Sequence, residues 1–442
     1  ISQHEILTEE YKELTHKTAV FKLAIKGKVN EYLLAWTTTP WTIPGNVALA
    51  VDKNFSYWKM ENENGEKIII INPTASGDLS KEDMLVNRLG LTKGWKKIEE
   101  LKGSDIVGYE YEAPYDNLPA VKKALKSYTH RVIATDSLIL PINPAEGTGI
   151  VHIAPGAGSE DFKLGKKENL PAIEEIDEGA VFINGFDFIT GLHVKKAMPQ
   201  ILEDLKNRNL IHEVFDYSHR YPTCWRCKTE LVWRVVDEWY ISMDKPSKSK
   251  VNPSASLRAR SQKSKVEGKT FREQMMKVAK KINWIPKWGL DRELDWLKNM
   301  HDWLISKKRY WGLALPIWEC KECGSFQVGG SKEELKKKTI EGWRRFNGNS
   351  PHRPWIDEIK IKCEKCGKIS SRVPDVGNPW LDAGIVPFST MPEDWFPADF
   401  ITESFPGQFK NWFYSLIAMS TALKNTNPFK TVLAFGSVRD EK

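Results

Sequence analysis

Six cysteines stand in C-x-x-C pairs, a spacing typical of metal or redox sites. Two pairs are followed by glycine, which permits the tight turn that points backbone N–H groups at sulfur. Their four thiolates are enough for one closed tetrahedral zinc site, and the match between the two pairs disfavours a redox role. We therefore expect a zinc site made by Cys320, Cys323, Cys363 and Cys366.

The remaining pair, Cys224 and Cys227, lacks the glycine and has no second pair near it in the sequence. A structural zinc site needs four ligands, so this pair is two ligands short. We expect these thiols to be free, oxidised to each other or weakly metallated. His219 is the nearby substitute ligand.

Two further segments carry groups able to hold a polar ligand. Residues 36–46 read WTTTPWTIPGN, which places hydroxyls where a strand breaks into a turn. Residues 147–162 read GTGIVHIAPGAGSEDF, in which Asp161 either caps a helix or binds a cationic amine. His152 on its apolar strand is by default a core histidine. Taken singly, each segment is explained equally well by a purely structural role, without a ligand.

The composition describes a multidomain globular protein. The chain has 442 residues, of which 41% are hydrophobic and 28% charged, which excludes a disordered or collagen-like chain. No apolar run reaches the length of a membrane span, so we expect no membrane partner and a cytoplasmic location. The net charge of +7 comes from residues 245–281, a stretch that either contacts phosphates or forms a solvated, serine-rich loop.

The elements that must position these groups divide into two halves. Short β-branched runs bounded by glycine, proline or asparagine predict a strand-rich region over residues 17–217, with helices at 81–88 and 197–208. Tryptophan becomes frequent after residue 221, and helical periodicity appears at 271–281, 290–306 and 408–423. The region around the two glycine-containing cysteine pairs is predicted to be a small metal-held insert.

Taken together, the motifs resemble those of the isoleucyl-tRNA synthetase family within the class I aminoacyl-tRNA synthetases. The resemblance rests on TTTPWTIPGN, GTGIVHIAPGAGSED, HRYPTCWRC, DWLISKKRYWG, NPWLDAG and GQFKNWFY, in that order, and spans nearly the whole chain. Valyl and leucyl relatives tend to carry Arg-Pro-Glu or Arg-Pro-Asp where this chain has Thr39-Pro40-Trp41. That difference favours isoleucine.

The resemblance implies an α/β multidomain fold in which a strand-rich, β-barrel-like editing domain is inserted in a partial Rossmann-type catalytic domain with a zinc-binding insert. The implied parts are a connective segment at 1–16, the editing domain at 17–217, connective and catalytic residues at 218–313, the zinc insert at 314–374 and the second Rossmann half at 375–442.

The resemblance also implies an activity. The whole protein would ligate isoleucine to its tRNA with ATP and Mg²⁺, and the editing domain would hydrolyse valine wrongly esterified to that tRNA. Asp161 would hold the substrate α-ammonium, and His152 would border the amino-acid side chain and help to exclude isoleucine. The terminal adenosine and the attacking water would be lined by Thr37, Thr38, Thr39 and Asn46.

A second implied site lies near the end of the chain, where Glu403, Gly407, Gln408 and Trp412 would sit near the aminoacyl-adenylate. The His-x-Gly-His and Lys-Met-Ser-Lys-Ser signatures of class I activation do not occur in the sequence. We therefore expect an internal fragment that edits but does not aminoacylate. The alternatives are a valyl or leucyl enzyme and a non-catalytic zinc module that binds tRNA.

Overall fold

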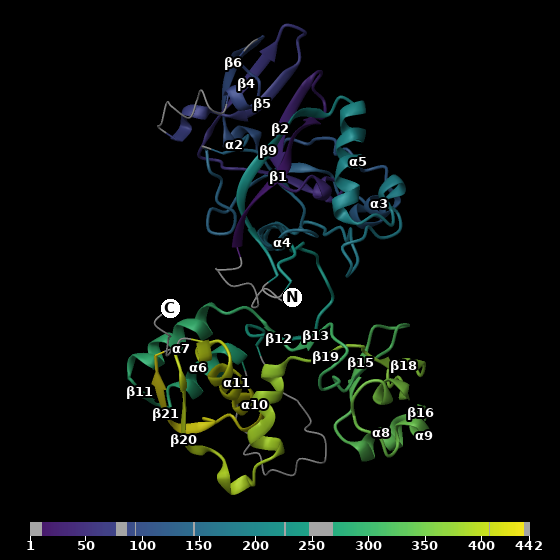
Figure 1. Ribbon diagram of the computed structural model, residues 1–442, viewed down its shortest axis with the longest axis vertical. Helices are drawn as coiled ribbons and strands as arrows, with labels where there is room; N and C mark the ends of the chain where they lie inside the picture. The colour runs from purple at the N-terminus through teal and green to yellow at the C-terminus, as the bar shows by residue number, and fades with distance from the viewer. Residues whose placement is uncertain are drawn as a thin grey trace. The chain divides into compact units, whose positions relative to one another are not determined.

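The computed structural model describes residues 11–76, 86–92, 94–144, 146–224, 227–246, 268–405 and 407–436. The chain forms two compact units, Ile1–Val236 and Asp237–Lys442 (Figure 1). Each unit has its own hydrophobic core, and each is described here by itself. The strongly basic stretch falls largely on residues 247–267, which lie outside the described ranges.

The first unit is built on one mixed sheet of nine strands within the described residues. Seven strands follow the order β6-β4-β5-β2-β8-β3-β7, while β1 pairs with both β2 and β9. The strands are β1 (Tyr11–Ala24), β2 (Glu31–Thr37), β3 (Ala48–Val51), β4 (Ser56–Asn62), β5 (Lys67–Ile71), β6 (Trp95–Lys102), β7 (Arg131–Ala134), β8 (Val151–Ile153) and β9 (Ile211–Pro222).

Short helices connect these strands and cover the sheet. Helix α5 carries an apolar stripe, Ala197, Ile201 and Leu205, at the spacing of one helix face, and it packs beside a 3₁₀ turn and β9 (Figure 1). The helical elements are η3 (Pro40–Gly45), η4 (Pro73–Ser76), α2 (Gly103–Ile106), α3 (Pro119–Leu125), α4 (Ser159–Lys167), η5 (Asp187–Ile189) and α5 (Val194–Asn207).

In the second unit, a strand–helix–strand crossover builds a small parallel sheet. Strand β21 pairs in parallel with both β11 and β20, and α11 connects β20 to β21. Figure 1 shows α6, α7, α10 and α11 gathered around these strands. Their bounds are α6 (Phe271–Ala279), β11 (Asn283–Ile285), α7 (Trp288–Asn299), α10 (Pro379–Ser389), η7 (Glu393–Trp395), β20 (Ala398–Ser404), η8 (Gly407–Phe409), α11 (Trp412–Lys424) and β21 (Phe429–Phe435).

A second sheet in this unit has five short strands in the order β15-β14-β18-β17-β16. This unit also contains two two-stranded pairs. They are β10 (Tyr240–Ile241) with β12 (Trp303–Leu304), and β13 (Ser306–Lys307) with β19 (Val376–Gly377). The elements of the five-stranded region are β14 (Ile317–Glu319), β15 (Phe326–Val328), α8 (Lys332–Lys338), β16 (Thr339–Glu341), α9 (Trp343–Phe346), η6 (Trp355–Glu358), β17 (Lys360–Lys362) and β18 (Ile369–Arg372).

Two predictions of local structure need correction, and a third is not tested. The helix predicted over 290–306 ends at Asn299, because the next residues are drawn into strand pairing between Trp303 and Ile241. Within DWLISKKRYWG, Trp303–Leu304 and Ser306–Lys307 form short strands. Strand β1 begins at Tyr11, since its polar half pairs with β9, a strand with many polar residues. The helix predicted at 81–88 falls mostly on residues outside the described ranges.

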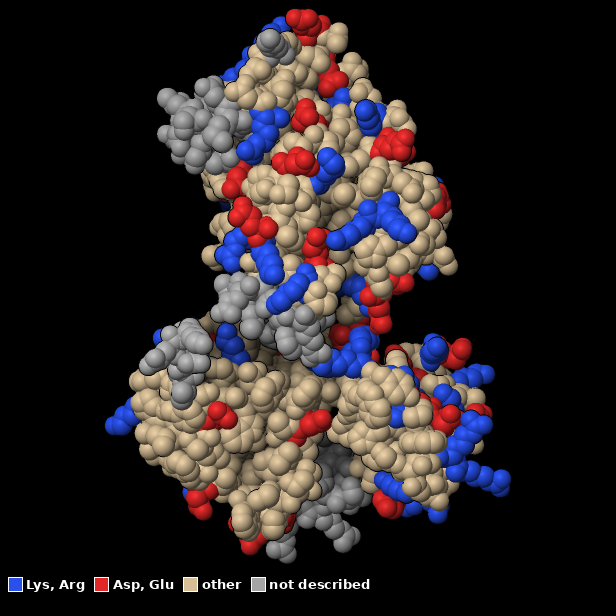
Figure 2. Space-filling view, viewed as in Figure 1, with Lys and Arg blue, Asp and Glu red and all other residues tan. Residues whose placement is uncertain are grey.

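Charge is distributed differently over the surface of the two units. On the face shown in Figure 2, Lys and Arg alternate with Asp and Glu over the first unit. The part of the second unit that carries the parallel sheet and its helices is largely uncharged on that face. Among the described residues, no helix is both long enough and apolar enough to cross a membrane.

Candidate functional site

Sheet pairing brings the threonine-rich and glycine-rich segments together. Strand β2 leads into the threonine-rich turn, and its residue Trp36 pairs with Val151 of β8. Strand β3, which follows the turn, pairs with the other side of β8, so that Leu49 lies opposite His152. The turn itself is the buried 3₁₀ segment η3. Pro40 stands at its first position, where proline is tolerated, and Pro44 lies inside it. Segments about one hundred residues apart thus share one site.

Two glycines of the second segment are required by close packing against strands β2 and β5. Gly147 has φ +66°, and a Cβ there would lie 2.2 Å from the Trp36 ring. Gly149 has φ +69°, and a Cβ there would lie 2.3 Å from Ile71. Both positions therefore need a residue without a side chain that tolerates the left-handed region. The two glycines thus allow close approach between this segment and the neighbouring strands.

Hydrogen bonds join four of the predicted site residues, Thr37, Thr39, Asn46 and His152, with Thr42, which the sequence did not single out. We call this set the threonine–histidine network. His152 Nδ1 lies 2.7 Å from Asn46 Nδ2, and its Nε2 lies 3.1 Å from Thr42 Oγ1. Thr42 Oγ1 donates to Thr39 O at 2.9 Å, and Thr39 N donates to Thr37 Oγ1 at 3.1 Å. The network fixes the orientation of the turn's hydroxyl groups.

His152 lies at the base of this network. Its side chain is buried, both ring nitrogens have partners, and Phe21 packs edge-on against it with ring centroids 5.9 Å apart. Burial lowers the pKa of His152 to about 4, so the imidazole is neutral across the physiological range. A neutral, fully engaged ring orients its neighbours but does not exchange a proton readily.

Asp161 belongs to the same region but not to the network. It lies in the first turn of α4, and its Oδ2 accepts a hydrogen bond of 2.8 Å from Ala154 N, just after β8. Desolvation raises the pKa of Asp161 to about 7, with the bond from Ala154 opposing and Glu160 adding to the shift. A partly enclosed carboxyl of this kind gains most from an ammonium partner, which restores its charge. Thr38 is half-buried.

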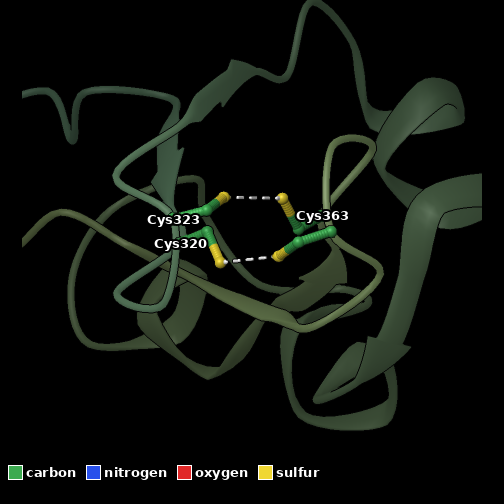
Figure 3. A group of neighbouring side chains, drawn as sticks. Cys320, Cys323 and Cys363 are labelled. Carbon is green, nitrogen blue, oxygen red and sulfur yellow. Dashed lines mark hydrogen bonds between the residues drawn. The ribbon is translucent and has the colours of Figure 1, made fainter.

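The four predicted zinc ligands form one cluster. Their sulfurs all lie within 4.8 Å of one another, with Cys320 to Cys366 at 3.5 Å and Cys323 to Cys363 at 3.7 Å (Figure 3). A tetrahedron with Zn–S bonds of about 2.3 Å has sulfur separations of about 3.8 Å. The donor set and its spacing therefore fit zinc, and the sequence prediction of a single four-cysteine cluster is confirmed.

The five-stranded sheet that carries this cluster explains its geometry. Cys320 and Cys323 lie in the turn between β14 and β15, while Cys363 and Cys366 lie in the turn between β17 and β18. Pairing of β14 with β18 places the two turns side by side. We call this sheet with its four cysteines the cysteine ribbon. The long interval between the two cysteine pairs is filled by α8, β16, α9 and η6.

The turn at Cys224 has the same backbone form as the two turns of the cysteine ribbon. Cys224 N donates to Thr229 O and Lys228 N donates to Cys224 O, both at 2.8 Å, as Cys320 N does to Ser325 O and Gly324 N to Cys320 O, both at 2.9 Å. Lys228 takes the left-handed φ of +59° that Gly324 takes with +64°. The missing glycine was therefore a misleading signal.

Within the described residues, Cys224 and Cys227 have no third ligand close enough to complete a metal site. His219, the substitute ligand named above, has its Nε2 2.9 Å from His16 Nδ1 across the β1–β9 pair. Cys227 is exposed, and its contact with the Thr229 hydroxyl at 3.2 Å lowers the pKa of the thiol to about 7. The pair is thus shaped for a metal but incomplete.

The residues predicted to contact the adenylate gather at the carboxyl end of β20. Glu403 lies near the end of that strand, Gly407 and Gln408 form η8, and Trp412 begins α11. Gln408 Oε1 accepts from Trp412 N at 3.2 Å, which ties η8 to the start of the helix. Ligands of open α/β sheets bind outside the carboxyl ends of parallel strands, so this edge is the expected place for one.

Comparison with known proteins identifies the class that this fold and these sites define. The family described as tRNA synthetases class I (I, L, M and V) matches residues 1–442. The chain belongs to this family, and the resemblance inferred from its motifs is confirmed.

Particular relatives narrow the comparison. The chain is 34% identical to isoleucine–tRNA ligase of Saccharolobus solfataricus and 37% identical to that of Clostridium novyi, each over 100% of this chain, and 33% identical to that of Methanothermobacter marburgensis over 98% of it. The chain spans about two fifths of the length of these relatives, 41%, 38% and 38% respectively. The crystal structure of GlLeuRS-CP1 aligns with 46% of this chain and 100% of its own, at 15% identity and a TM-score of 0.34.

Proposed function

We propose that this chain is part of a class I synthetase that attaches isoleucine to its tRNA, and that its first unit hydrolyses valine esterified to that tRNA. The observation that carries the proposal is the threonine–histidine network with Asp161 beside it. The network orients hydroxyl groups at a strand end, while Asp161 offers a carboxylate to an amine. The similarity to isoleucine–tRNA ligases supports isoleucine as the amino acid.

The need for a second site follows from the energetics of recognition. One missing methylene changes binding by only about 1 to 3 kcal/mol, of which isoleucine against valine is the best-known example. A synthetic site alone therefore admits valine too often. A second site that accepts only the smaller side chain removes the error by hydrolysis.

In the proposed reaction, Asp161 binds the α-ammonium of the aminoacyl ester. Thr37, Thr38 and Thr39 with Asn46 line the place of the terminal adenosine and the water that attacks the ester carbonyl. His152 limits the size of the amino-acid side chain. Its depressed pKa argues against a role as general base, so the adjacent ribose hydroxyl of the tRNA is the group we propose to assist the water.

The second unit supplies two further parts of the proposal. Cys320, Cys323, Cys363 and Cys366 would hold a structural zinc, which keeps the two hairpin turns together. Glu403, Gly407, Gln408 and Trp412 would lie against the aminoacyl-adenylate, whose formation in the whole protein needs ATP and Mg²⁺. The domain limits 1–16, 17–217, 218–313, 314–374 and 375–442, the Rossmann and barrel character of the two folds and a cytoplasmic location belong to the same proposal.

The experiment that tests this function is hydrolysis of Val-tRNA and Ile-tRNA, both charged on isoleucine tRNA, by the chain. We expect Val-tRNA to be cleared and Ile-tRNA to be spared. The His152→Ala variant should admit isoleucine because a larger space opens behind the turn. Equal hydrolysis of the two esters by the parent chain, or none, contradicts editing, and binding without hydrolysis favours the non-catalytic zinc module.

A further inference from the structure

Tyr111, a tyrosine outside every motif, is hydrogen-bonded to the threonine–histidine network. Tyr111 is fully buried, and its hydroxyl lies 2.7 Å from Asn46 Oδ1. Its ring packs on His130 with centroids 5.3 Å apart, and His130 Nδ1 lies 2.8 Å from the carbonyl of Val47, the neighbour of Asn46. Tyr111 is therefore held rigidly against the residue that anchors the network.

The orientation of the Asn46 amide is determined by its surroundings. One atom of the amide lies 3.2 Å from Ala48 O, which can only accept, so that atom must be the NH₂ nitrogen. The other atom is the oxygen, and it faces Tyr111. The tyrosine hydroxyl is thus the donor of this bond. Burial holds the pKa of Tyr111 well above its ordinary value, so the donor keeps its proton.

The orientation of the Asn46 amide determines the direction of the other hydrogen bonds in the network. Asn46 Nδ2 donates to His152 Nδ1 at 2.7 Å, which makes Nδ1 the nitrogen without hydrogen. The neutral imidazole must carry its hydrogen on Nε2, which faces Thr42 O at 3.2 Å and Thr42 Oγ1 at 3.1 Å. With His152 as donor, Thr42 Oγ1 can give its own hydrogen to Thr39 O.

We propose that Tyr111 is a positioning residue of the editing site: together with Ala48 O, its hydroxyl holds the Asn46 amide that sets the His152 tautomer and, through it, the direction of the Thr42 hydroxyl and the shape of the threonine-rich turn. The inference rests on the proposed editing function for its kinetic consequence. Its structural consequence, the tautomer of His152, does not. Without the donor at Tyr111, the buried Asn46 oxygen is left unpaired, and rotation of the amide becomes the way to satisfy it.

The test compares Tyr111→Phe with Tyr115→Phe in the full chain. Tyr115 is a matched control because it is equally buried and its hydroxyl bonds to Asp204 at 2.9 Å, away from the network. We expect kcat for Val-tRNA hydrolysis to fall about tenfold in Tyr111→Phe with KM within about twofold, and to stay within about twofold of the parent in Tyr115→Phe. Tyr111→Phe should lower the melting temperature more than Tyr115→Phe, because it leaves the buried Asn46 oxygen unpaired, whereas Asp204 keeps its hydrogen bond from Arg208.

A second readout uses ¹⁵N-histidine labelling, with the His152 signals assigned from their loss in His152→Gln. The parent should show the Nε2–H form, and Tyr111→Phe should show a mixture of tautomers. Asn46→Asp, which removes the donor to Nδ1, should shift His152 to the Nδ1–H form. An Nδ1–H tautomer in the parent, or an unchanged Nε2–H tautomer with unchanged kcat in Tyr111→Phe, overturns the inference. If neither the parent nor any variant hydrolyses Val-tRNA, the proposed function fails. The His152 tautomers still decide the role of Tyr111 in that case.

Discussion

The threonine–histidine network and the cysteine ribbon hold their functional groups by different means. The network lies against the large hydrophobic core of the first unit, and side-chain hydrogen bonds join His152 to Thr42 and to Asn46. The cysteine ribbon has a hydrophobic cluster of only seven buried residues, among them Trp318 and Ile359. A core of that size is too small to order a domain alone, so we propose that a metal held by the four sulfurs supplies the missing free energy. Packing would then position the first site, and coordination the second.

Removing zinc should therefore have the largest effect, and it should be confined to the cysteine ribbon. Structural zinc contributes about 10 to 16 kcal/mol of apparent binding free energy in small metal domains, so Cys320→Ser should unfold the ribbon. Hydrogen exchange should show loss of protection from β14 to β18, and metal analysis should fall from one tightly held zinc per chain to none. Cys227→Ser is the matched control. Equal protection of the ribbon in Cys320→Ser and the parent would mean that packing alone is sufficient there.

Asp161→Asn tests the other half of the comparison. The amide oxygen can still accept from Ala154 N, so the fold should persist, while the charge that pairs with the substrate ammonium is lost. Charged hydrogen bonds contribute about 1.5 to 3 kcal/mol, which corresponds to a fall in kcat/KM for Val-tRNA of about 10-fold to 150-fold. Glu160→Gln, one residue earlier in α4, is the control. A parental rate in folded Asp161→Asn would remove Asp161 from the site.

The pH dependence sharpens the same assignment. Because the pKa of Asp161 is raised to about 7, its carboxylate forms only as the pH passes that value, and kcat/KM for Val-tRNA should rise through pH 7. Between about pH 4 and pH 7 the native state keeps a proton on Asp161 that the unfolded state has lost. The contribution of Asp161 to stability should therefore fall as the pH rises through this range. His152, with a pKa of about 4, is already neutral in the native state near pH 7 and does not produce the rise in kcat/KM there. The fall in kcat/KM below pH 7 should be absent in Asp161→Asn. If that fall persists in the variant, another group causes it.

The smallest effect concerns the turn at Cys224. It has the backbone of a metal-binding turn without a second pair among the described residues, and Cys227 is exposed. Thiol reagents should therefore modify Cys224 and Cys227 faster than the four cysteines of the ribbon, since no metal masks them. Mass spectrometry after brief labelling measures the order. Protection of all six thiols, with two zinc ions per chain, would show that other groups complete a second site.

The sequence by itself determined the chemistry that could be present. The spacing of the glycine-containing cysteine pairs predicted a four-sulfur cluster, and the structure confirms it. The paired threonine-rich and glycine-rich segments indicated the family. Both signals are local, because a turn of a few residues sets the geometry of a C-x-x-C pair, and a motif keeps its residue types wherever the chain takes it.

Only the tertiary structure decided which groups meet and how their hydrogens point. Tyr111 carries no motif, and it bonds to the threonine–histidine network because sheet pairing brings Asn46 and His152 close to it. Lys228 shows the same limit at short range, since it adopts a glycine-like conformation that its residue type does not indicate. The helix predicted to continue past Asn299 stops there because Trp303 finds a strand partner in Ile241. Long-range pairing and burial outweigh local preference in each case, because a buried polar or apolar group gains more from its tertiary partner than the chain loses in local propensity.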